Sequence, residues 1–344
     1  MKTKRITITD IAEKSGYSKT AVSFAFNCPS RISREACEKI LAVAKELDYI
    51  PDPMARNFSL GRHMSIGFLM PQIAQACLAN PYMQEVIKGI GIICQSHGYN
   101  LTIIPPLHSS IAEAVKNATV DGLITMGLTV DQSISDTLRQ RKLPFVTIDG
   151  VPSRDIVSIN IDDEGAAELE MRTVLEHGHR KIAVLALPDN AYSSSDDACA
   201  ATITRKRRNG YIAALSKQGM TLDDVQYHSC DATFDDGYQS TQRILEKSRP
   251  TCFVCMSDIA AIGSVKAIRE KGLRVPEDIS VIGFDGISAG FLMETGLTTI
   301  EQSAEEKGLK SAETLFMILD GKMPENNNLT IPFRLLERGS LSRI

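Results

Sequence analysis

The sequence predicts an α/β protein with a small, all-helical N-terminal region followed by a large body of two doubly wound parallel sheets. Residues 7–47 place apolar side chains at helical spacing between capping residues. From residue 65, short apolar runs alternate with amphipathic helices, which is typical of a parallel sheet covered by helices. The alternation begins again at Lys181, so we expect two sheets in the body.

Composition restricts the class of protein further. The chain has 344 residues, of which 43% are hydrophobic and 23% charged, enough for two or three packed units. The first ten residues, MKTKRITITD, lack an apolar signal region, and no run approaches the roughly 18 to 20 apolar residues of a membrane helix. We therefore expect a cytoplasmic protein, and the eight scattered cysteines are expected to be free thiols.

Charge divides the chain into a basic head and an acidic remainder. Residues 1–62 hold 11 lysines and arginines against seven aspartates and glutamates, a net charge of +4, so the rest of a chain with net charge −4 carries −8. A basic head on an acidic body is typical of a nucleic-acid-binding module joined to another domain. A solvated charged surface is the alternative.

Three short helices are expected in the head. Thr7 caps ITDIAEKS, which ends at Gly16, Ser18 caps KTAVSFAFN, and Ser33 caps REACEKILAVAKELD. The apolar positions that should form the small core are Ile8, Ile11, Ala12, Val22, Ala25, Phe26, Ile40, Val43, Ala44 and Leu47.

The first two helices and their three-residue turn have the pattern of a helix-turn-helix, whose second helix enters the major groove of DNA. The exposed face of that helix lies opposite Val22. Phe24 on this face either points to the groove, where its ring can contact a thymine methyl, or folds back on the third helix or the hinge.

A hinge follows the head. Asp52 is an N-cap with Pro53 at the first helical position, and a short helix MARNFSL ends at Gly61. So short a helix is marginal alone. We expect it to become ordered when DNA and the matching helix of a second subunit hold it.

The body is expected to consist of strands and helices in alternation. The predicted strands of the first half are 65–70, 101–106, 121–127, 144–150 and 158–161, and those of the second half include 181–187, 252–257 and 279–286. Ligands of such folds bind at the carboxyl ends of the strands. With two sheets, the expected site is the cleft between them.

The head closely resembles that of the lactose-repressor family of bacterial transcription regulators, through ITDIAEKSGYSKTAVSFAFN and ISREACEKILAVAKELDYIPDPMARNFSLGR. The resemblance implies a wedge in the minor groove at Phe58, where the family has leucine, so the preferred base step stays open. The implied DNA-contacting residues are Thr7, Ser18, Lys19, Thr20, Ser23, Phe24, Asn27, Arg31, Ser33, Ala55 and Phe58.

The body resembles the sensor domain of the same family, which is shaped like the periplasmic sugar-binding proteins. The motifs are DGLI, HGHRKIAVL, RRNGYIAAL, DIAAIG, GLRVPEDISVIGFDG and LTTIEQ. The resemblance implies an effector site lined by Tyr82, Met83, Asp162, Arg207, Asp258 and Asp285. Aspartate and arginine at strand ends can hold hydroxyls or a carboxylate, although Asp162 and Asp258 can instead cap the helices that follow them.

The expected organisation is a helix-turn-helix domain over 1–50, a hinge over 51–62 and an effector-binding and dimerisation domain over 63–344. Its two subdomains are expected to be joined by crossovers near 161–163, 295–300 and 322–328. The polar stretch 187–204 does not match the family and is expected to be a loop specific to the effector.

The expected function is sequence-specific transcription regulation, as a repressor controlled by a small-molecule effector that is a sugar or related metabolite. The protein is expected to bind a palindromic operator as a homodimer. The alternative is a solute-binding protein without a regulatory role, which would share the body but not the basic head. An enzyme is not expected, because no nucleophile–base pair or phosphate loop is recognisable.

No cofactor and no metal site are expected. Cys252 and Cys255 form C-x-x-C inside a strand, where their side chains point to opposite faces. Gly89 and Gly91 lie in a helix and lack the third glycine of a dinucleotide loop. The effector's identity, its role as inducer or corepressor and the operator sequence are not determined by the sequence.

Overall fold

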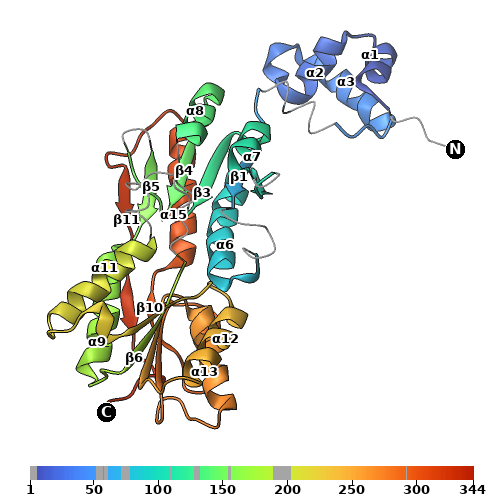
Figure 1. The fold of residues 1–344 in the computed structure, drawn as a ribbon. Helices are drawn as coiled ribbons and strands as arrows, with labels where there is room; N and C mark the ends of the chain where they lie inside the picture. Colours follow the sequence, from blue (N-terminus) through green and yellow to red (C-terminus); the bar gives the residue numbers. More distant parts are fainter. Residues whose placement is uncertain are drawn as a thin grey trace. The chain divides into compact units, whose positions relative to one another are not determined.

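The computed structural model describes residues 6–51, 57, 61–70, 78–107, 110–127, 132–153, 156–188, 203–291 and 293–344. The chain divides into two compact units. The first comprises residues 1–64 with 119–121, and the second comprises the rest of the chain, which forms the α/β body (Figure 1).

The head contains the three helices expected from the sequence, which confirms that part of the fold prediction. They are α1 (Ile8–Ser15), α2 (Lys19–Asn27) and α3 (Arg34–Glu46), with a 3₁₀ turn η1 (Pro29–Arg31) between the last two. The hydroxyls of Ser18 and Ser33 accept hydrogen bonds from the backbone N–H groups of Ala21 (3.1 Å) and Ala36 (3.2 Å). These caps satisfy N–H groups that a helix start leaves without partners.

The core of the head is formed where the apolar stripes of the three helices meet. Its fully or nearly fully buried members are Ile11, Ala12, Val22, Ala25, Ile40 and Ala44. Small residues among them let the helices approach closely, so a core of few side chains can hold the unit together.

The described part of the body contains two sheets, as predicted, and each has six strands. The first has the order β11-β5-β4-β3-β1-β2 and is parallel throughout. Its strands are β1 (Ser65–Leu69), β2 (Asn100–Ile104), β3 (Gly122–Met126), β4 (Phe145–Ile148), β5 (Val157–Asn160) and β11 (Asn328–Thr330).

The second sheet has the order β12-β10-β9-β8-β6-β7, and only β12 runs antiparallel to its neighbour. Its strands are β6 (Ile182–Ala186), β7 (Gln226–Ser229), β8 (Cys252–Cys255), β9 (Ser280–Asp285), β10 (Thr298–Glu301) and β12 (Arg334–Leu336). The inner strands of both sheets are buried on both faces, which explains their continuous apolar sequence.

Helices cover both sheets (Figure 1). Those packed with the first sheet are α6 (Pro81–Ser96), α7 (Ile111–Asn117), α8 (Gln132–Arg141) and α15 (Ala304–Leu319). Those associated with the second are α9 (Asp163–Glu176), α11 (Ile203–Ser216), α12 (Phe234–Leu245), α13 (Asp258–Glu270) and the short α14 (Ser288–Phe291), with η2 (Leu222–Asp224) before β7. No helix in the described ranges has the length and apolar character needed to cross a membrane.

Helices α6 and α15 pack through glycines. A Cβ on Gly89 would lie 2.2 Å from the carbonyl oxygen of Glu305, and one on Gly308 would lie 2.2 Å from that of Val86. The two backbones are therefore closer than any side chain allows. This contact fixes the start of α15, which carries side chains of the site described below.

Over the residues that the structure describes, the chain passes between the two sheets three times. The passages lie between β5 and α9, between β10 and α15, and between β11 and β12, at residues 161–162, 302–303 and 331–333. The sequence analysis placed the last two near 295–300 and 322–328. Residues 298–301 and 328–330 are instead strands, because the first segment pairs with β9 of the second sheet and the other pairs with β5 of the first.

Candidate ligand site and nucleic-acid interface

The predicted DNA-contacting residues of the head are described from Thr7 to Ser33. Ser18, Lys19, Thr20, Arg31 and Ser33 are exposed, as is Thr7. Ser23, Phe24 and Asn27 are half-buried. Side chains from the N-terminal turn of α2 are therefore accessible to a macromolecular partner. Ala55 and Phe58, the predicted hinge contacts, lie outside the described residues, as does most of the 187–204 loop.

The two phenylalanines of α2 have different surroundings. Phe26 packs against the head core and its ring lies 5.6 Å from that of Tyr49. Phe24 is half-buried and not part of that core, and the guanidinium carbon of Arg31 lies 5.5 Å from its ring centroid. The helical geometry of α2 therefore puts Val22 and Phe26 on the side of the core and leaves Phe24 outside it.

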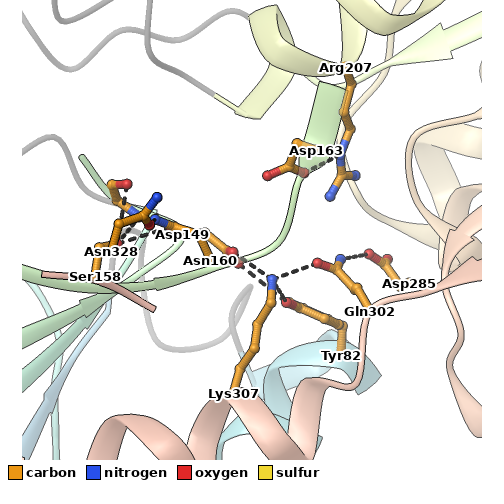
Figure 2. Close-up of polar contacts among 11 residues, drawn as sticks. Tyr82, Asp149, Ser158, Asn160, Asp163, Arg207, Asp285, Gln302, Lys307 and Asn328 are labelled. Atoms are coloured by element: carbon orange, nitrogen blue, oxygen red, sulfur yellow. Dashed lines mark hydrogen bonds and ion pairs between the residues drawn. The ribbon is translucent and has the colours of Figure 1, made fainter. Parts of the chain in front are cut away.

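In the body, a buried lysine lies at the centre of a polar cluster between the two sheets (Figure 2). The Lys307 ammonium, fully buried, donates to Asp149 Oδ1 at 2.5 Å, Gln302 Oε1 at 2.7 Å and the Tyr82 hydroxyl oxygen at 3.0 Å. Gln302 Nε2 in turn donates to Asp285 Oδ1 at 2.6 Å. Asp149 follows β4 of the first sheet and Asp285 ends β9 of the second, so one chain of hydrogen bonds joins both sheets.

A second ion pair lies on the opposite side of the same region (Figure 2). Arg207 on α11 donates from Nε to Asp163 Oδ1 at 3.0 Å and from Nη1 to the Met256 carbonyl at 2.8 Å. Its guanidinium carbon lies 3.5 Å from the ring centroid of Phe284. Arg207 and Asp163 are both nearly fully buried, so the cation is held by its carboxylate, a carbonyl and an aromatic face.

Buried hydrogen bonds fix the turn that carries Asp149. The Ser158 hydroxyl contacts both the N–H and the carbonyl of Gly150 at 3.2 Å, and donates to Asn160 Oδ1 at 3.0 Å. Asn160 Nδ2 donates to Asn328 Oδ1 at 2.7 Å, which ties the edge strand β11 to the set. Asp149 has φ of +54°, a left-handed conformation that this support stabilises.

Asp258 and Asp285 are two buried carboxyl groups near the second sheet. Burial, with a contribution from Asp285, raises the pKa of Asp258 to about 7. Burial raises the pKa of Asp285 to about 6, although Arg207 opposes the shift. Asp258 accepts hydrogen bonds from the N–H groups of Gly286 and Ile287 and from the Thr299 hydroxyl. Its oxygens thus hold the turn after Asp285 in place.

A cavity of about 390 Å³ opens beside the cluster. Tyr82, Asp285 and Ala304 contribute to its lining, from the start of α6, the end of β9 and the start of α15. This volume lies in the range of small-molecule sites, and its position at strand ends is where ligands bind in α/β folds.

The structure brings together only part of the predicted effector set. Tyr82, Arg207 and Asp285 lie in the polar region, while Met83 belongs to the apolar core of the first subdomain. Asp162 caps α9, accepting from the Gly165 N–H at 3.0 Å. Asp258 bonds to the turn that follows β9, as described above. Asp162 therefore caps a helix, which is the alternative considered from the sequence. Asp258 does not cap a helix but holds the turn after β9.

Four residues of the cluster were missed by the sequence analysis: Asp149, Asp163, Gln302 and Lys307. Asp149 lies at the end of the predicted strand 144–150, so its strand-end position was a usable signal, and Gln302 ends the family motif LTTIEQ. Asp163 is adjacent to the predicted Asp162. Lys307 had no signal, because a lysine in the amphipathic stretch AEEKGLK is expected to face solvent.

The remaining candidates for metal or thiol chemistry have structural roles. Cys252 and Cys255 are fully buried in β8, and burial raises the pKa of both thiols. His179 contacts the Thr251 hydroxyl at 2.9 Å and the Ser342 carbonyl at 3.0 Å. Among the residues with described positions, no group of three or more His, Cys, Asp or Glu side chains is arranged to hold a metal ion.

Two family models match the chain. Residues 7–52 match the bacterial regulatory proteins of the lacI family, and residues 63–339 match the periplasmic binding proteins and sugar-binding domain of the LacI family. The segment between the two matches contains the predicted hinge helix. A match to the regulatory head distinguishes the chain from solute-binding proteins that share only the body.

Similar proteins include the HTH-type transcriptional repressor PurR of Erwinia tasmaniensis, 31% identical with 98% of this chain and 97% of that protein covered. The HTH-type transcriptional repressor CytR of Escherichia coli K12 is 29% identical, with 97% and 96% covered. The crystal structure of the lac repressor dimer bound to operator and the anti-inducer ONPF is 26% identical, with a TM-score of 0.79 and coverage of 98% and 100%. The helix-turn-helix head, the two-sheet body and the similarity over the full length lead to the same conclusion. The chain belongs to the LacI family of bacterial regulatory proteins and is a DNA-binding regulator of transcription.

Proposed function

We propose that this regulator is a repressor whose body binds a small polar effector between the two sheets, and that occupancy of this site controls operator binding by the head. The observation that carries the proposal is the buried cluster in which Lys307, Gln302 and Asp285 link the sheets. A ligand that contacts both sheets changes the free energy of their arrangement, and only such differential contact can shift a conformational equilibrium.

The effector class we infer is a neutral, polyhydroxylated molecule such as a sugar. The two buried cations of the cluster already have carboxylate partners, at 2.5 Å for Lys307 and 3.0 Å for Arg207. A ligand with a net charge would leave one of these groups unbalanced inside the protein, at a large desolvation cost. Hydroxyl groups can both donate to the aspartates and accept from the guanidinium without disturbing that balance.

The matching DNA partner we propose is a palindromic operator read by a homodimer. One helix-turn-helix contacts a half-site only, and two heads related by two-fold symmetry read both halves. Lys19, Thr20, Ser23 and Phe24 on α2 are proposed to contact bases, with Thr7, Ser18, Asn27, Arg31 and Ser33 beside them or at the backbone. A regulator of this kind acts on the chromosome, and we place it in the cytoplasm.

The hinge is proposed to contact the minor groove through Ala55 and Phe58. Phenylalanine is among the apolar side chains that enter base steps and kink DNA. Replacing Phe58 with alanine should weaken operator binding and reduce the DNA bend together, while leucine should restore most of both. A bend that circular-permutation mobility finds unchanged in the alanine variant would contradict the wedge.

The effector proposal is tested first by thermal shift of the full-length protein with sugars, nucleosides and purine bases. A ligand at 100 times its dissociation constant stabilises the folded state by roughly 2.7 kcal/mol. Operator selected from random DNA then serves in fluorescence anisotropy with and without the stabilising ligand. Weaker binding with ligand identifies an inducer, and tighter binding identifies a corepressor.

Site variants then locate the effector. Arg207→Gln and Asp285→Asn should abolish the ligand's effect on operator affinity, with basal affinity near that of the wild type. Asp162→Ala is the matched control, because Asp162 caps α9 and should leave the ligand response intact. Urea midpoints verify that each variant is folded. If both site variants respond as the wild type does, the effector lies elsewhere.

The DNA-binding proposal has its own test. Operator affinity should fall steeply between about 50 and 200 mM salt, because phosphate contacts release counterions. A protein beginning at His63 should give no specific retardation of the selected operator. Retained specific binding by that shortened protein would overturn the assignment of the head.

A further inference from the structure

A second cavity, of about 330 Å³, lies at the outer edge of the second sheet, away from β9 and β12. It is bounded by the edge strand β7 and by the face of α12 that Ser240, Arg243 and Ile244 share. Ser248, after the end of that helix, donates to Gln226 Oε1 at 2.8 Å and so ties the helix end to β7. The cavity is thus framed by secondary structure that a hydrogen bond holds in place.

The side chains in this cavity are mainly cationic and hydroxylic. Arg243 and Lys247 reach it from the helix side and His228 from β7, while the eight described lining residues include no aspartate or glutamate. A carboxylate outside the lining, that of Asp236, has its Oδ1 3.4 Å from Arg243 Nη2 and accepts at Oδ2 from the Asp231 N–H. Arg243 thus has an ion-pair partner outside the lining.

The basic side chains act on one another electrostatically. Burial lowers the pKa of His228, and the charges of Arg243 and Lys247 lower it further. Repulsion of this kind is relieved when an anion occupies the space between the groups. The Arg243 side chain is 65% exposed, so an anion can enter from solvent.

We propose that this cavity binds the phosphate group of a small phosphorylated metabolite, held by Arg243, Lys247 and His228. A guanidinium offers a planar pair of donors and an ammonium a compact charge, the combination that recognises phosphate oxygens. The Ser229 hydroxyl supplies a further donor. The volume lies near the lower end for small-molecule sites, which suits a phosphate with a short organic group.

The site is distinct from the polar cluster around Lys307, and its ligand can bind without occupying the effector cleft. The two sites share no lining residue among those described. A metabolite bound at β7 and α12 would thus be a second chemical input to the same regulator.

The experiment measures binding of inorganic phosphate and of glycerol phosphate to the full-length protein by calorimetry, at low and constant ionic strength with chloride as the reference anion. The double variant R243Q/K247Q should bind both at least about tenfold more weakly, since each charge-assisted hydrogen bond contributes more than one factor of ten. Lys271→Gln, an exposed lysine of the same subdomain outside the cavity, is the matched control and should bind as the wild type. Tighter binding of glycerol phosphate identifies a metabolite, and equal binding identifies the free ion.

Nuclear magnetic resonance of the six histidines locates the bound anion. The His228 ring signal, assigned by its absence in His228→Gln, should move on addition of phosphate and its pKa should rise, because an anion stabilises the imidazolium. Unaltered affinity in R243Q/K247Q, or a His228 signal that phosphate leaves unmoved, would overturn the proposal. The effector screen above is independent of either result.

Discussion

Replacing Lys307 with methionine should destabilise the body more than any replacement of an exposed lysine. The ammonium is fully buried and its removal leaves the Asp149 carboxylate, whose side chain is 3% exposed, without its cation. Breaking a buried pair in this way costs about 3 to 5 kcal/mol, because one charge stays in the interior uncompensated. The Tyr82 hydroxyl, 3.3 Å from Asp149 Oδ2, offsets only part of that cost.

A double-mutant cycle separates the ion pair from the packing of the lysine stem. Asp149→Asn alone should also destabilise the protein, and asparagine tolerates the positive φ of this position. The double variant K307M/D149N removes both charges, so its loss of stability should be smaller than the sum of the single losses, by up to about 3 kcal/mol. The free energy of unfolding is measured by urea denaturation with circular dichroism.

An exposed ion pair on the same helices is the control. Lys88 and Glu305 lie 2.5 Å apart on α6 and α15, with side chains 58% and 36% exposed. Lys88→Met should leave the urea midpoint nearly unchanged, because water and salt screen such a pair. A Lys307→Met variant as stable as the wild type, or a double variant that loses the full sum, would refute the role given to the buried pair.

Stability should also depend on pH through the two buried carboxyl groups. Their pKa values of about 7 for Asp258 and about 6 for Asp285 exceed the ordinary 3.8, so their contribution to stability is present at low pH and lost as the pH rises from about 4 to 7. The urea midpoint should therefore fall less between pH 5 and pH 7.5 in Asp285→Asn than in the wild type. An equal fall in both proteins would contradict this prediction. Gly89→Ala should destabilise the protein by about 1 to 3 kcal/mol, because its Cβ would meet the Glu305 carbonyl at 2.2 Å. Gly91→Ala, where the nearest side-chain atom is 4.0 Å away, should be neutral or stabilising, and similar thermal midpoints for the two variants would count against the close packing of α6 and α15.

The fold was predictable because its signals are local or periodic. Helix caps at Ser18 and Ser33 and the apolar spacing of α2 and α3 determine the head without reference to distant residues. Continuous apolar strands alternating with helices predict the two parallel sheets, since a strand buried on both faces needs no polar side chains. The residues at which the chain passes between the sheets were harder to predict from the sequence. Short segments such as 328–330 become strands only because they pair with the edge of an existing sheet.

The candidate site was predictable in part. Arg207 and Asp285 stand in recognisable strand-end or helix motifs, and strand ends of α/β sheets point to one edge. Asp162 and Asp163 are neighbours in sequence, yet one caps a helix and the other pairs with Arg207, a difference set by which way α9 turns at its first residue. No pattern in one sequence encodes that direction.

The family resemblance, the helical head, the two-sheet body and a candidate ligand site between the sheets all follow from the sequence. The burial of Lys307, its contacts with Asp149 and Gln302 and the hold of Asp258 on a backbone turn are visible in the three-dimensional structure alone. The physical reason is that periodicity reports which face of a helix is apolar, whereas the partners of a polar side chain come from segments up to 225 residues away in the chain. Their encounter depends on how α15 lies on the first sheet, and that is fixed by packing across the whole body.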